Sequence, residues 1–501
     1  MSDSTKIFET KFLVLGSGMG GMAAGSLLAR DGLKPVVLEA AHVPGGCSSS
    51  YKRKGYIFES GATTLIGFDE KQPLWKLEKE LGIDLPKKEL LPSMAVHIDG
   101  EPIIRYKDRD EWIKEAGRVF GNPEQQRKFW KEAFKVADVV WEASGKNVFF
   151  PPRKLHEWLR MAVNNNPVHL PVLRHAFRSV QSTMKSYKVD TPKFRRFIDE
   201  QLMITAQAKS PETPFLFGAP AITYTNYRNF YVDGGLLEMV RVLENYLTER
   251  GGEVKCRRKV VSVEALSGTG YRVKTANGEE YLAEHVISNI PSWNLKDMTD
   301  PWMRTWFKKQ SDRFSEAWGA ITMGVVTSDE YADDLPLHHQ LHLPEGKTVP
   351  FTNSESVFVS MSMRGDHTRA PEGKRVLNVS THANTKTWFE MNGSYDQNKA
   401  AAEEFILDHL NKTLPGFSES EFVLAHTATP VTWQNWVYRK EGRVGGIPQQ
   451  MSRSVLDWTP AETPFKGFWL CGDTVYPGQG IPAVTLSGIN VYYRIKHDLN
   501  F

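Results

Sequence analysis

The sequence predicts an α/β fold in which a central parallel sheet binds a dinucleotide. Three observations lead to it: an apolar run at 11–15, a glycine-rich turn at 16–21, and a second apolar run at 36–38 that ends on the acid Glu39. Small, helix-forming residues at 23–29 separate the two runs. Because the GxGxxG glycines lie between a strand and a helix, they form the βαβ dinucleotide fingerprint in its required context.

Each residue of this Rossmann-like fingerprint has its own physical role. Gly16 turns the chain tightly out of the strand, Gly18 lets the backbone approach a pyrophosphate, and Gly21 lets the helix pack close to the sheet. The N-terminus of the helix offers free N–H groups and a partial positive charge to phosphates. Glu39, which stands 18 residues after Gly21, is placed to accept hydrogen bonds from ribose hydroxyls.

A second glycine pair, Gly45-Gly46, follows the acid and indicates which dinucleotide binds. This pair resembles the extended motif of FAD-binding flavoproteins of the amine oxidase and phytoene desaturase type. In those proteins the pair lets the backbone pass close to the diphosphate of the cofactor, a requirement that NAD-dependent dehydrogenases lack. The resemblance implies FAD, bound without a covalent link.

Between the two termini, residues 231–236 precede an amphipathic helix with apolar positions from 237 to 247. A strand is expected at 259–263, where the resemblance implies that Val260 contacts the adenine; a plain core valine is the alternative. The segments 271–275 and 280–287, separated by Asn277-Gly278, predict a hairpin.

The C-terminal part of the chain carries a second set of flavoprotein features. An apolar run at 466–470 predicts a strand that ends in Gly472-Asp473, and a small-residue helix follows. Asp473 resembles the flavoprotein residue that holds the ribityl chain or the pyrophosphate. This helix, which the small residues 486–490 indicate, would point its N-terminus at the flavin ring, where its partial positive charge favours the anionic reduced form.

Taken together, the motifs from Lys11 to Ile495 resemble the family of FAD-dependent phytoene desaturases, carotenoid cis-trans isomerases and retinol saturases, within the amine oxidase-like flavoproteins. Segments 55–63, 429–430 and 442–448 add to the match, and 477–480 is closer to the isomerase and saturase branches. The resemblance implies that the cofactor is held by Gly16, Gly18, Met19, Gly20, Gly21, Glu39, Ala40, Gly45, Gly46, Cys47, Ser48, Gly61, Ala62, Thr63, Val260, Gly472, Asp473, Gly480, Ile481 and Pro482.

The same resemblance implies an interleaved plan of two domains. The FAD-binding domain would combine residues 1–95, 226–298 and 426–501. A mixed α+β substrate domain would be formed by 96–225 and 299–425. The chain of 501 residues is long enough for such a plan.

Composition and charge narrow the class of protein further. The net charge of +3 gives no indication of nucleic-acid binding, and the three cysteines lie far apart without metal-ligand spacing. Residues 1–10 are polar, and no run of about 18 apolar residues follows, so we expect neither a secretory signal nor a transmembrane helix. We expect a cytoplasmic protein, peripheral on the inner face of a membrane.

One insertion, residues 146–197, is strongly basic. It contains eleven lysines or arginines against two acids, a local charge of +9. Aromatic and aliphatic residues are interleaved with the basic ones, among them Trp158, Leu159, Phe177, Phe194 and Phe197. We expect this segment to dock on anionic lipid headgroups as the lid of a substrate tunnel. The alternative is a solvated basic face over an ordinary core.

The resemblance implies an oxidoreductase that transfers hydride between a C–H bond of a carotenoid, retinoid or other isoprenoid lipid and flavin N5, by desaturation or saturation. A redox-neutral carotene cis-trans isomerase that uses reduced FAD is the first alternative. An amine oxidase is the second, with Tyr476 and either Trp433 or Trp436 as an aromatic cage. A flavin of purely structural use, or an escort for prenyl lipids, is the non-enzymatic alternative. Glu59 is a candidate acid or base, although a surface carboxylate is the preferred interpretation, so no catalytic residue is assigned.

Overall fold

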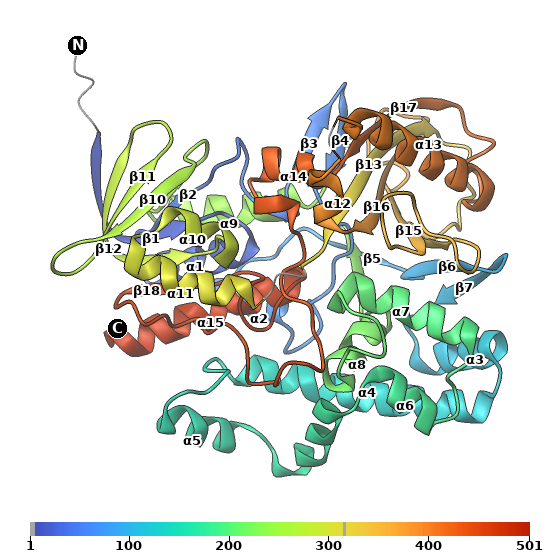
Figure 1. The fold of residues 1–501 in the computed structure, drawn as a ribbon, viewed down its shortest axis with the longest axis horizontal. Helices are drawn as coiled ribbons and strands as arrows, with labels where there is room; N and C mark the ends of the chain where they lie inside the picture. Colours follow the sequence, from blue (N-terminus) through green and yellow to red (C-terminus); the bar gives the residue numbers. More distant parts are fainter. Residues whose placement is uncertain (1–5, 314–316, 392) are drawn as a thin grey trace.

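The computed structural model describes residues 6–313, 317–391 and 393–501. Among these residues, two large sheets and a helical region make up the molecule (Figure 1). The first sheet lies at the left of Figure 1, the second at the upper right, and the helical region below them. The chain crosses between these parts several times, so each is assembled from distant segments.

The first sheet has the strand order β10-β11-β12-β1-β2-β9, and β18 also pairs with β12. Its strands are β1 (Ile7–Leu15), β2 (Val36–Leu38), β9 (Glu253–Lys255), β10 (Val260–Ala265), β11 (Tyr271–Thr275), β12 (Glu280–Ser288) and β18 (Phe468–Leu470). The pairs of β1 with β2 and β12, of β2 with β9, and of β12 with β18 are parallel. The antiparallel pair β11–β12 confirms the predicted hairpin.

The second sheet has the order β17-β13-β16-β15-β14-β6-β7. Its strands are β6 (Met94–Ile98), β7 (Glu101–Arg105), β13 (Gly319–Ser328), β14 (His338–His342), β15 (Ser356–Met361), β16 (Lys374–Ala383) and β17 (Phe422–Ala428). Two small sheets pair β3 (Ser50–Arg53) with β4 (Tyr56–Glu59) and β5 (Lys88–Leu90) with β8 (Asn229–Tyr231). Because β6 spans residues 94–98, it crosses the predicted domain boundary at 95; the domain division itself stays a prediction.

The α-helices are α1 (Met19–Arg30), α2 (Pro73–Leu81), α3 (Arg109–Phe120), α4 (Pro123–Lys146), α5 (Leu155–Asn164), α6 (Val180–Ser186), α7 (Pro192–Ala206), α8 (Phe215–Thr223), α9 (Leu237–Glu249), α10 (Ser292–Met298), α11 (Pro301–Asp312), α12 (Thr385–Phe389), α13 (Tyr395–Thr413), α14 (Pro430–Val437) and α15 (Ile481–Leu499). The 3-10 helices are η1 (Gly46–Ser48), η2 (Pro167–Phe177), η3 (Tyr224–Asn226) and η4 (Lys440–Gly442).

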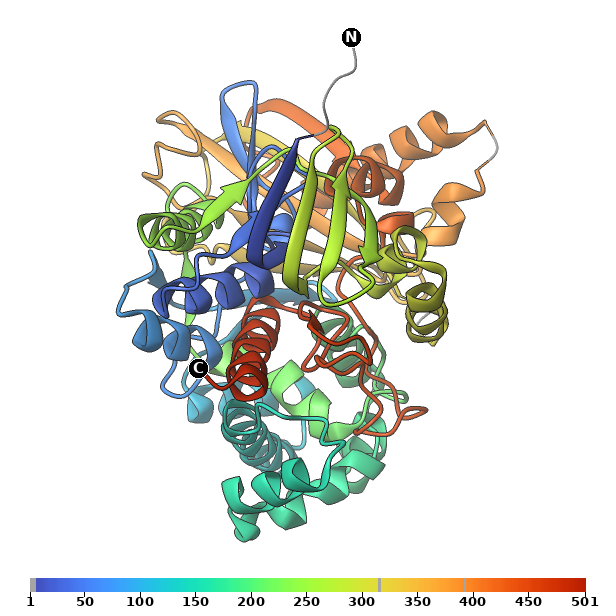
Figure 2. The same ribbon diagram turned by 90° about the vertical axis from the view of Figure 1, so that its left-hand side faces the viewer.

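Helices α1 and α15, from opposite ends of the chain, pack closely against each other. A Cβ atom added to Gly488 of α15 would lie 2.2 Å from the carbonyl oxygen of Gly20 of α1, so only glycine allows this approach. Figure 2 shows α15 between the first sheet and the helical region. The pair therefore brings the two predicted flavoprotein motifs together.

The helical region has an aromatic core of its own. Trp112, Trp130, Phe194 and Phe197 are fully buried in it. The prediction that Phe194 and Phe197 belong to an exposed docking segment is therefore wrong. Both lie on α7, whose apolar face packs inward, whereas α5 and η2 carry exposed apolar side chains.

Candidate functional site

The glycine-rich turn connects β1 to α1 without side-chain bulk. Gly16 has φ +92° and donates its N–H to the carbonyl of Leu38 at 2.8 Å. A Cβ atom on Gly21 would lie 2.2 Å from the carbonyl oxygen of Gly16. Only a glycine at position 21 therefore lets the start of the helix pack this closely against the turn. Gly18 is the N-cap, and Met19 and Gly20 open α1. The N–H groups of this first turn have no intrahelical acceptor, so they form the anion-binding end of the helix.

Glu39 lies directly after β2 and is buried against the same turn. One of its carboxylate oxygens accepts hydrogen bonds from the N–H (3.0 Å) and the hydroxyl (2.5 Å) of Ser17. The other accepts from the N–H of Ala41 at 2.8 Å, and Ala40 lies between the two. These bonds fix the carboxylate at the carboxyl ends of β1 and β2, where a ribose binds in this class of fold.

Val260 begins β10 and is buried in the core of the first sheet. Two residues earlier, Arg258 donates its N–H to the carbonyl of Glu39 at 2.7 Å. Val260 is therefore near the carboxylate that the sequence assigns to the ribose. Its predicted contact with adenine stays a prediction.

The second glycine pair lies beside the first glycine-rich turn. Gly45 (φ +107°) forms a bridge with Gly18 and donates its N–H to the carbonyl of Ser17 at 3.1 Å. A Cβ atom on Gly46 would lie 3.6 Å from the Cα of Gly18. The two glycine motifs thus form one continuous backbone surface that lacks side chains, as a diphosphate requires.

Cys47 and Ser48 complete η1, which lies beside the segment that follows β4. The carbonyl of Cys47 accepts the N–H of Ala62 at 2.9 Å. A Cβ atom on Gly61 would lie 2.6 Å from the ring of Trp433, so Gly61 lets α14 approach; Thr63 follows two residues later. Burial raises the pKa of the Cys47 thiol, which keeps it protonated at neutral pH.

The C-terminal motif reaches the same place from β18. Gly472 (φ +95°) donates its N–H to the hydroxyl of Ser487 at 2.8 Å. Cβ atoms built on Gly18, Gly20 and Gly472 would lie 2.6, 2.7 and 2.7 Å from the side-chain amide of Asn289. Asn289 directly follows β12 and was not predicted. The sequence feature that could have indicated Asn289 is its place as a polar residue at the carboxyl end of a strand that pairs in parallel with β1.

Asp473 is held by an arginine that sequence reasoning also missed. The Nη2 of Arg439 donates to its carboxylate at 2.7 Å, and both side chains are almost buried. Burial alone would lower the pKa of Arg439, but Asp473 outweighs it and the pKa is raised, so the guanidinium stays charged. No motif marks Arg439, which lies in a loop far from Asp473 in sequence.

Gly480 is the N-cap of α15, and Ile481 and Pro482 open it, so the helix begins five residues before the small-residue segment 486–490 from which it was expected. A Cβ atom on Gly67 would lie 2.9 Å from the ring of Pro482, so the lack of a side chain at Gly67 lets the two residues pack closely. A Cβ atom on Gly445 would lie 1.7 Å from Nε2 of Gln207 and 2.2 Å from Oε1 of Gln479. Two glutamines therefore converge beside the N-terminus of this helix.

An apolar cluster lies next to this point and is made of Phe150, Phe217, Ile447, Trp458 and Tyr476. The ring centroids of Phe150 and Tyr476 are 4.4 Å apart, and those of Trp458 and Tyr476 are 5.7 Å apart. Of the two tryptophans proposed for the aromatic cage, Trp436 is 71 % exposed, whereas Trp433 is buried with its ring beside Gly61. A cage of Tyr476 and Trp433 stays a prediction.

Glu59 is buried, so its interpretation as a surface carboxylate is wrong. It accepts hydrogen bonds from the Ser50 hydroxyl (2.8 Å) and the Leu236 N–H (3.2 Å), and it pairs with Arg369 at 3.3 Å. Burial raises the pKa of Glu59, and Arg369 opposes the rise. Through these contacts the Glu59 carboxylate links β4 to the loop before α9 and to the loop before β16.

A mixed sheet whose strands β9, β2, β1, β12 and β18 pair in parallel, with glycine turns and two helix N-termini around Asn289, defines a dinucleotide-binding oxidoreductase fold. The chain belongs to the family described as flavin containing amine oxidoreductase, whose model matches residues 19–495. Family membership confirms the predicted fold class, the enzyme class and a flavin cofactor.

Relatives and solved structures agree with this assignment. A chloroplastic prolycopene isomerase from Daucus carota is 26 % identical over 98 % of this chain and 80 % of its own length. A 4,4'-diapophytoene desaturase from Methylomonas sp is 23 % identical over 94 % of this chain and 92 % of its own length. A cyclohexylamine oxidase from Brevibacterium oxydans shares the fold, with a TM-score of 0.64 at 13 % identity over 98 % of this chain and all of that one.

Proposed function

We propose that this flavoenzyme binds FAD and transfers hydride between a C–H bond of a carotenoid or another long isoprenoid lipid and the flavin. The observation that carries the proposal is the apolar cluster of Phe150, Phe217, Ile447, Trp458 and Tyr476 beside the N-terminus of α15. An extended polyene has no charged group to satisfy, and aromatic and aliphatic walls are the surroundings that bind it. The names of the relatives, prolycopene isomerase and diapophytoene desaturase, point to the same substrate class.

FAD fits the residues that the fold brings together. Glu39 would hold the adenosine ribose, the joined glycine turns and the N-terminus of α1 would hold the diphosphate, and Asp473 with Arg439 would hold the ribityl region. When bound, the flavin supplies a hydride acceptor or donor. The N-terminus of α15 would favour negative charge on the reduced ring system.

The protein's own contribution would be to position the substrate and exclude water. Phe150, Trp458 and Tyr476 pack together and would form an apolar wall for the substrate near the N-terminus of α15. The Tyr476 hydroxyl is already engaged with Ser144 at 3.0 Å. Holding a rigid polyene in one orientation lowers the entropic part of the barrier. Desaturation transfers a hydride to the flavin and releases a proton from the neighbouring carbon, and saturation adds both; the group that would accept or supply the proton is not assigned.

A redox-neutral cis-trans isomerase that uses reduced FAD is the second candidate. It is favoured by the order of similarity: four prolycopene isomerases match at 25–26 % identity over 97–100 % of the chain, whereas the desaturase and oxygenases match at 20–23 %. The amine oxidase alternative is supported by solved structures at 13–16 % identity, which show the fold alone.

Cofactor and substrate class can be tested on one preparation. Heat denaturation should release a flavin whose mass is that of FAD; FMN or no flavin would contradict the cofactor assignment. Under anaerobic conditions, phytoene should bleach the visible absorbance of the oxidised flavin if the enzyme desaturates polyenes. Bleaching by a panel of primary amines, with polyenes inert, would favour the amine oxidase candidate instead.

A further inference from the structure

Helix α5 (Leu155–Asn164) turns its apolar face to solvent. Leu155, Trp158, Leu159 and Val163 are 78, 42, 60 and 85 % exposed. Their spacing places them on one side of the helix. Within α5, all of which the structure describes, the only buried residue is Glu157. A helix on the surface of a globular domain has the opposite arrangement, so α5 is built for an apolar neighbour outside the chain.

The segment that follows α5 extends this surface. In η2 (Pro167–Phe177), Val168, Leu170, Leu173 and Phe177 are 52–80 % exposed. Eight of the 19 large apolar side chains that are exposed among the described residues therefore lie between 155 and 177. We refer to these eight side chains as the α5–η2 surface. Such a concentration marks an interaction site rather than ordinary scattered exposure.

Basic residues flank the α5–η2 surface. The exposed side chains between 153 and 178 that carry positive charge are Arg153, Lys154, Arg160, Arg174 and Arg178. The only acid in this stretch is Glu157, so its net charge is 5 − 1 = +4, in a chain whose total is +3. The partner that fits is thus apolar at its centre and anionic at its border.

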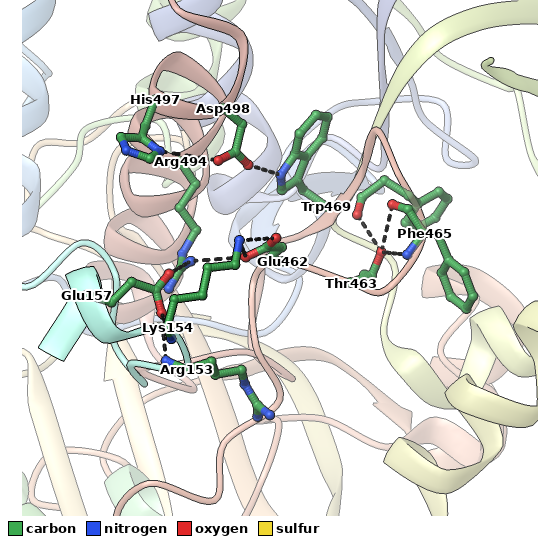
Figure 3. Close-up of polar contacts among 11 residues, drawn as sticks. Arg153, Lys154, Glu157, Glu462, Thr463, Phe465, Trp469, Arg494, His497 and Asp498 are labelled. Carbon is green, nitrogen blue, oxygen red and sulfur yellow. Dashed lines mark hydrogen bonds and ion pairs between the residues drawn. The ribbon is translucent and has the colours of Figure 1, made fainter.

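A buried ion pair fixes α5 to the body of the enzyme (Figure 3). Oε1 of Glu157 accepts a hydrogen bond from Nη1 of Arg494 at 3.0 Å, and the two side chains are 2 and 4 % exposed. Lys154 pairs with Glu462 at 2.8 Å, and the N–H of Arg153 donates to Glu157 at 2.6 Å. Since Arg494 belongs to α15, the surface is held in a fixed position relative to the candidate site.

The inner side of α5 leads to that site. A small hollow of about 10 Å³ behind the helix is lined by Phe149, Phe150, Pro152 and Met161, together with the charged side chains of Glu157 and Arg160. The ring of Phe150 also contacts the ring of Tyr476 at a tilt of 49°, in the apolar cluster beside the N-terminus of α15. Apolar side chains therefore connect the back of α5 to the place where the flavin is expected.

We propose that the α5–η2 surface docks on an anionic lipid bilayer, with its apolar side chains in the interfacial layer and its basic side chains among the headgroups. Helices of the described residues are too short or too polar to cross a membrane, so the contact lies in the plane of the interface. That an isoprenoid enters the enzyme from the bilayer beside α5 rests on the proposed function; the docking itself does not.

Flotation of the purified holoenzyme with phosphatidylcholine vesicles, with or without phosphatidylglycerol, tests the docking. We expect the enzyme to float with anionic vesicles at low salt and less with neutral ones. The triple variant Leu155→Ser, Leu159→Ser, Val163→Ser should lower the partition constant at least about tenfold, because it removes three immersed apolar side chains. Its flavin spectrum should stay unchanged. Arg160→Glu with Arg178→Glu should remove the preference for anionic vesicles.

A matched control removes three exposed apolar side chains elsewhere: Val261→Ser, Phe422→Ser and Val423→Ser, on β10 and β17. It should float like the unchanged enzyme. No flotation of the unchanged enzyme at low salt, or equal flotation of the α5 variant, would overturn the proposal. A dimer in sedimentation velocity that the α5 variant loses, without any flotation, would assign the surface to self-association instead. These measurements use no substrate, so a failure of the polyene assay leaves them unaffected.

Discussion

Gly18 lies at the point where both glycine turns and Asn289 meet. Its φ of −58° is open to any residue, and a Cβ atom there would meet the end of the Asn289 side chain at 2.6 Å. The Gly18→Val variant should therefore fold but purify without flavin, because the new side chain occupies the space of the diphosphate. Absorbance of the purified variant checks this.

The control for Gly18→Val is Gly268→Val, at a glycine that has open space around its Cβ position. This variant should keep its flavin. A yellow Gly18→Val protein with the normal spectrum would refute the assignment of the turn to the diphosphate.

A second prediction at the residue scale concerns the buried ion pair of Glu59 and Arg369. Replacing Glu59 by Ala leaves Arg369, which is 3 % exposed, without its carboxylate, so the free energy of unfolding should fall by about 3 kcal/mol. Chemical unfolding followed by circular dichroism measures the change. The double variant Glu59→Leu, Arg369→Met should recover part of the loss; a single variant as stable as the unchanged protein would contradict the account.

At the scale of one element, strand β14 should make the protein sensitive to acid. Burial lowers the pKa of His338 to about 4 and that of His339 and His342 to about 3. His97 of β6 faces His339 at 3.1 Å and lowers its pKa further. The unfolded chain binds protons below about pH 6.5, where the folded state does not, so stability is lost as the pH falls from about 6.5 toward 4.

The variant His339→Gln removes one of the histidines that bind a proton in the unfolded chain but not in the folded state. The slope of the unfolding free energy against pH should decrease by about 1.4 kcal/mol per pH unit between pH 6 and 4. Denaturant unfolding at a series of pH values gives this slope, and His156→Gln, at an exposed position on α5, is the control. An unchanged slope in His339→Gln would show that this ring is already charged in the folded state.

The elements that the sequence predicts well are those with a local pattern. The turn from β1 to α1, the acid after β2, the β11–β12 hairpin and strand β18 each depend on neighbouring residues. Helix α15 was expected as well, but it begins at Ile481, before the small residues 486–490 that indicated it. The exposure of side chains in the basic insertion, residues 146–197, was harder to predict. An apolar residue in the sequence does not indicate whether its helix turns that side chain to solvent or to the core. Trp158 and Leu159 face solvent as expected of a docking segment, whereas Phe194 and Phe197 fill a core.

At the scale of the whole molecule, the candidate site is assembled from segments that lie far apart in the chain. Asn289 comes from the end of β12 and Arg439 from the loop after α14, and neither belongs to a motif. Asn289 carries one signal in the sequence, its place at the carboxyl end of β12, and the parallel pairing of β12 with β1 and β18 brings it to the glycine turns. Arg439 carries none, because its contact with Asp473 depends on the path of a loop. Motif residues were predictable because each motif supplies its own geometry.

The central claim is that this flavoenzyme acts on a polyene, and product mass and geometry test it most directly. Phytoene and poly-cis-lycopene would be supplied in liposomes to the enzyme, with its flavin oxidised in one series and reduced in another. Liquid chromatography with mass spectrometry should show loss of hydrogen pairs with oxidised flavin. Unchanged mass with a shifted retention time, with reduced flavin only, would establish the isomerase. Recovery of both polyenes unaltered in both series would contradict the account.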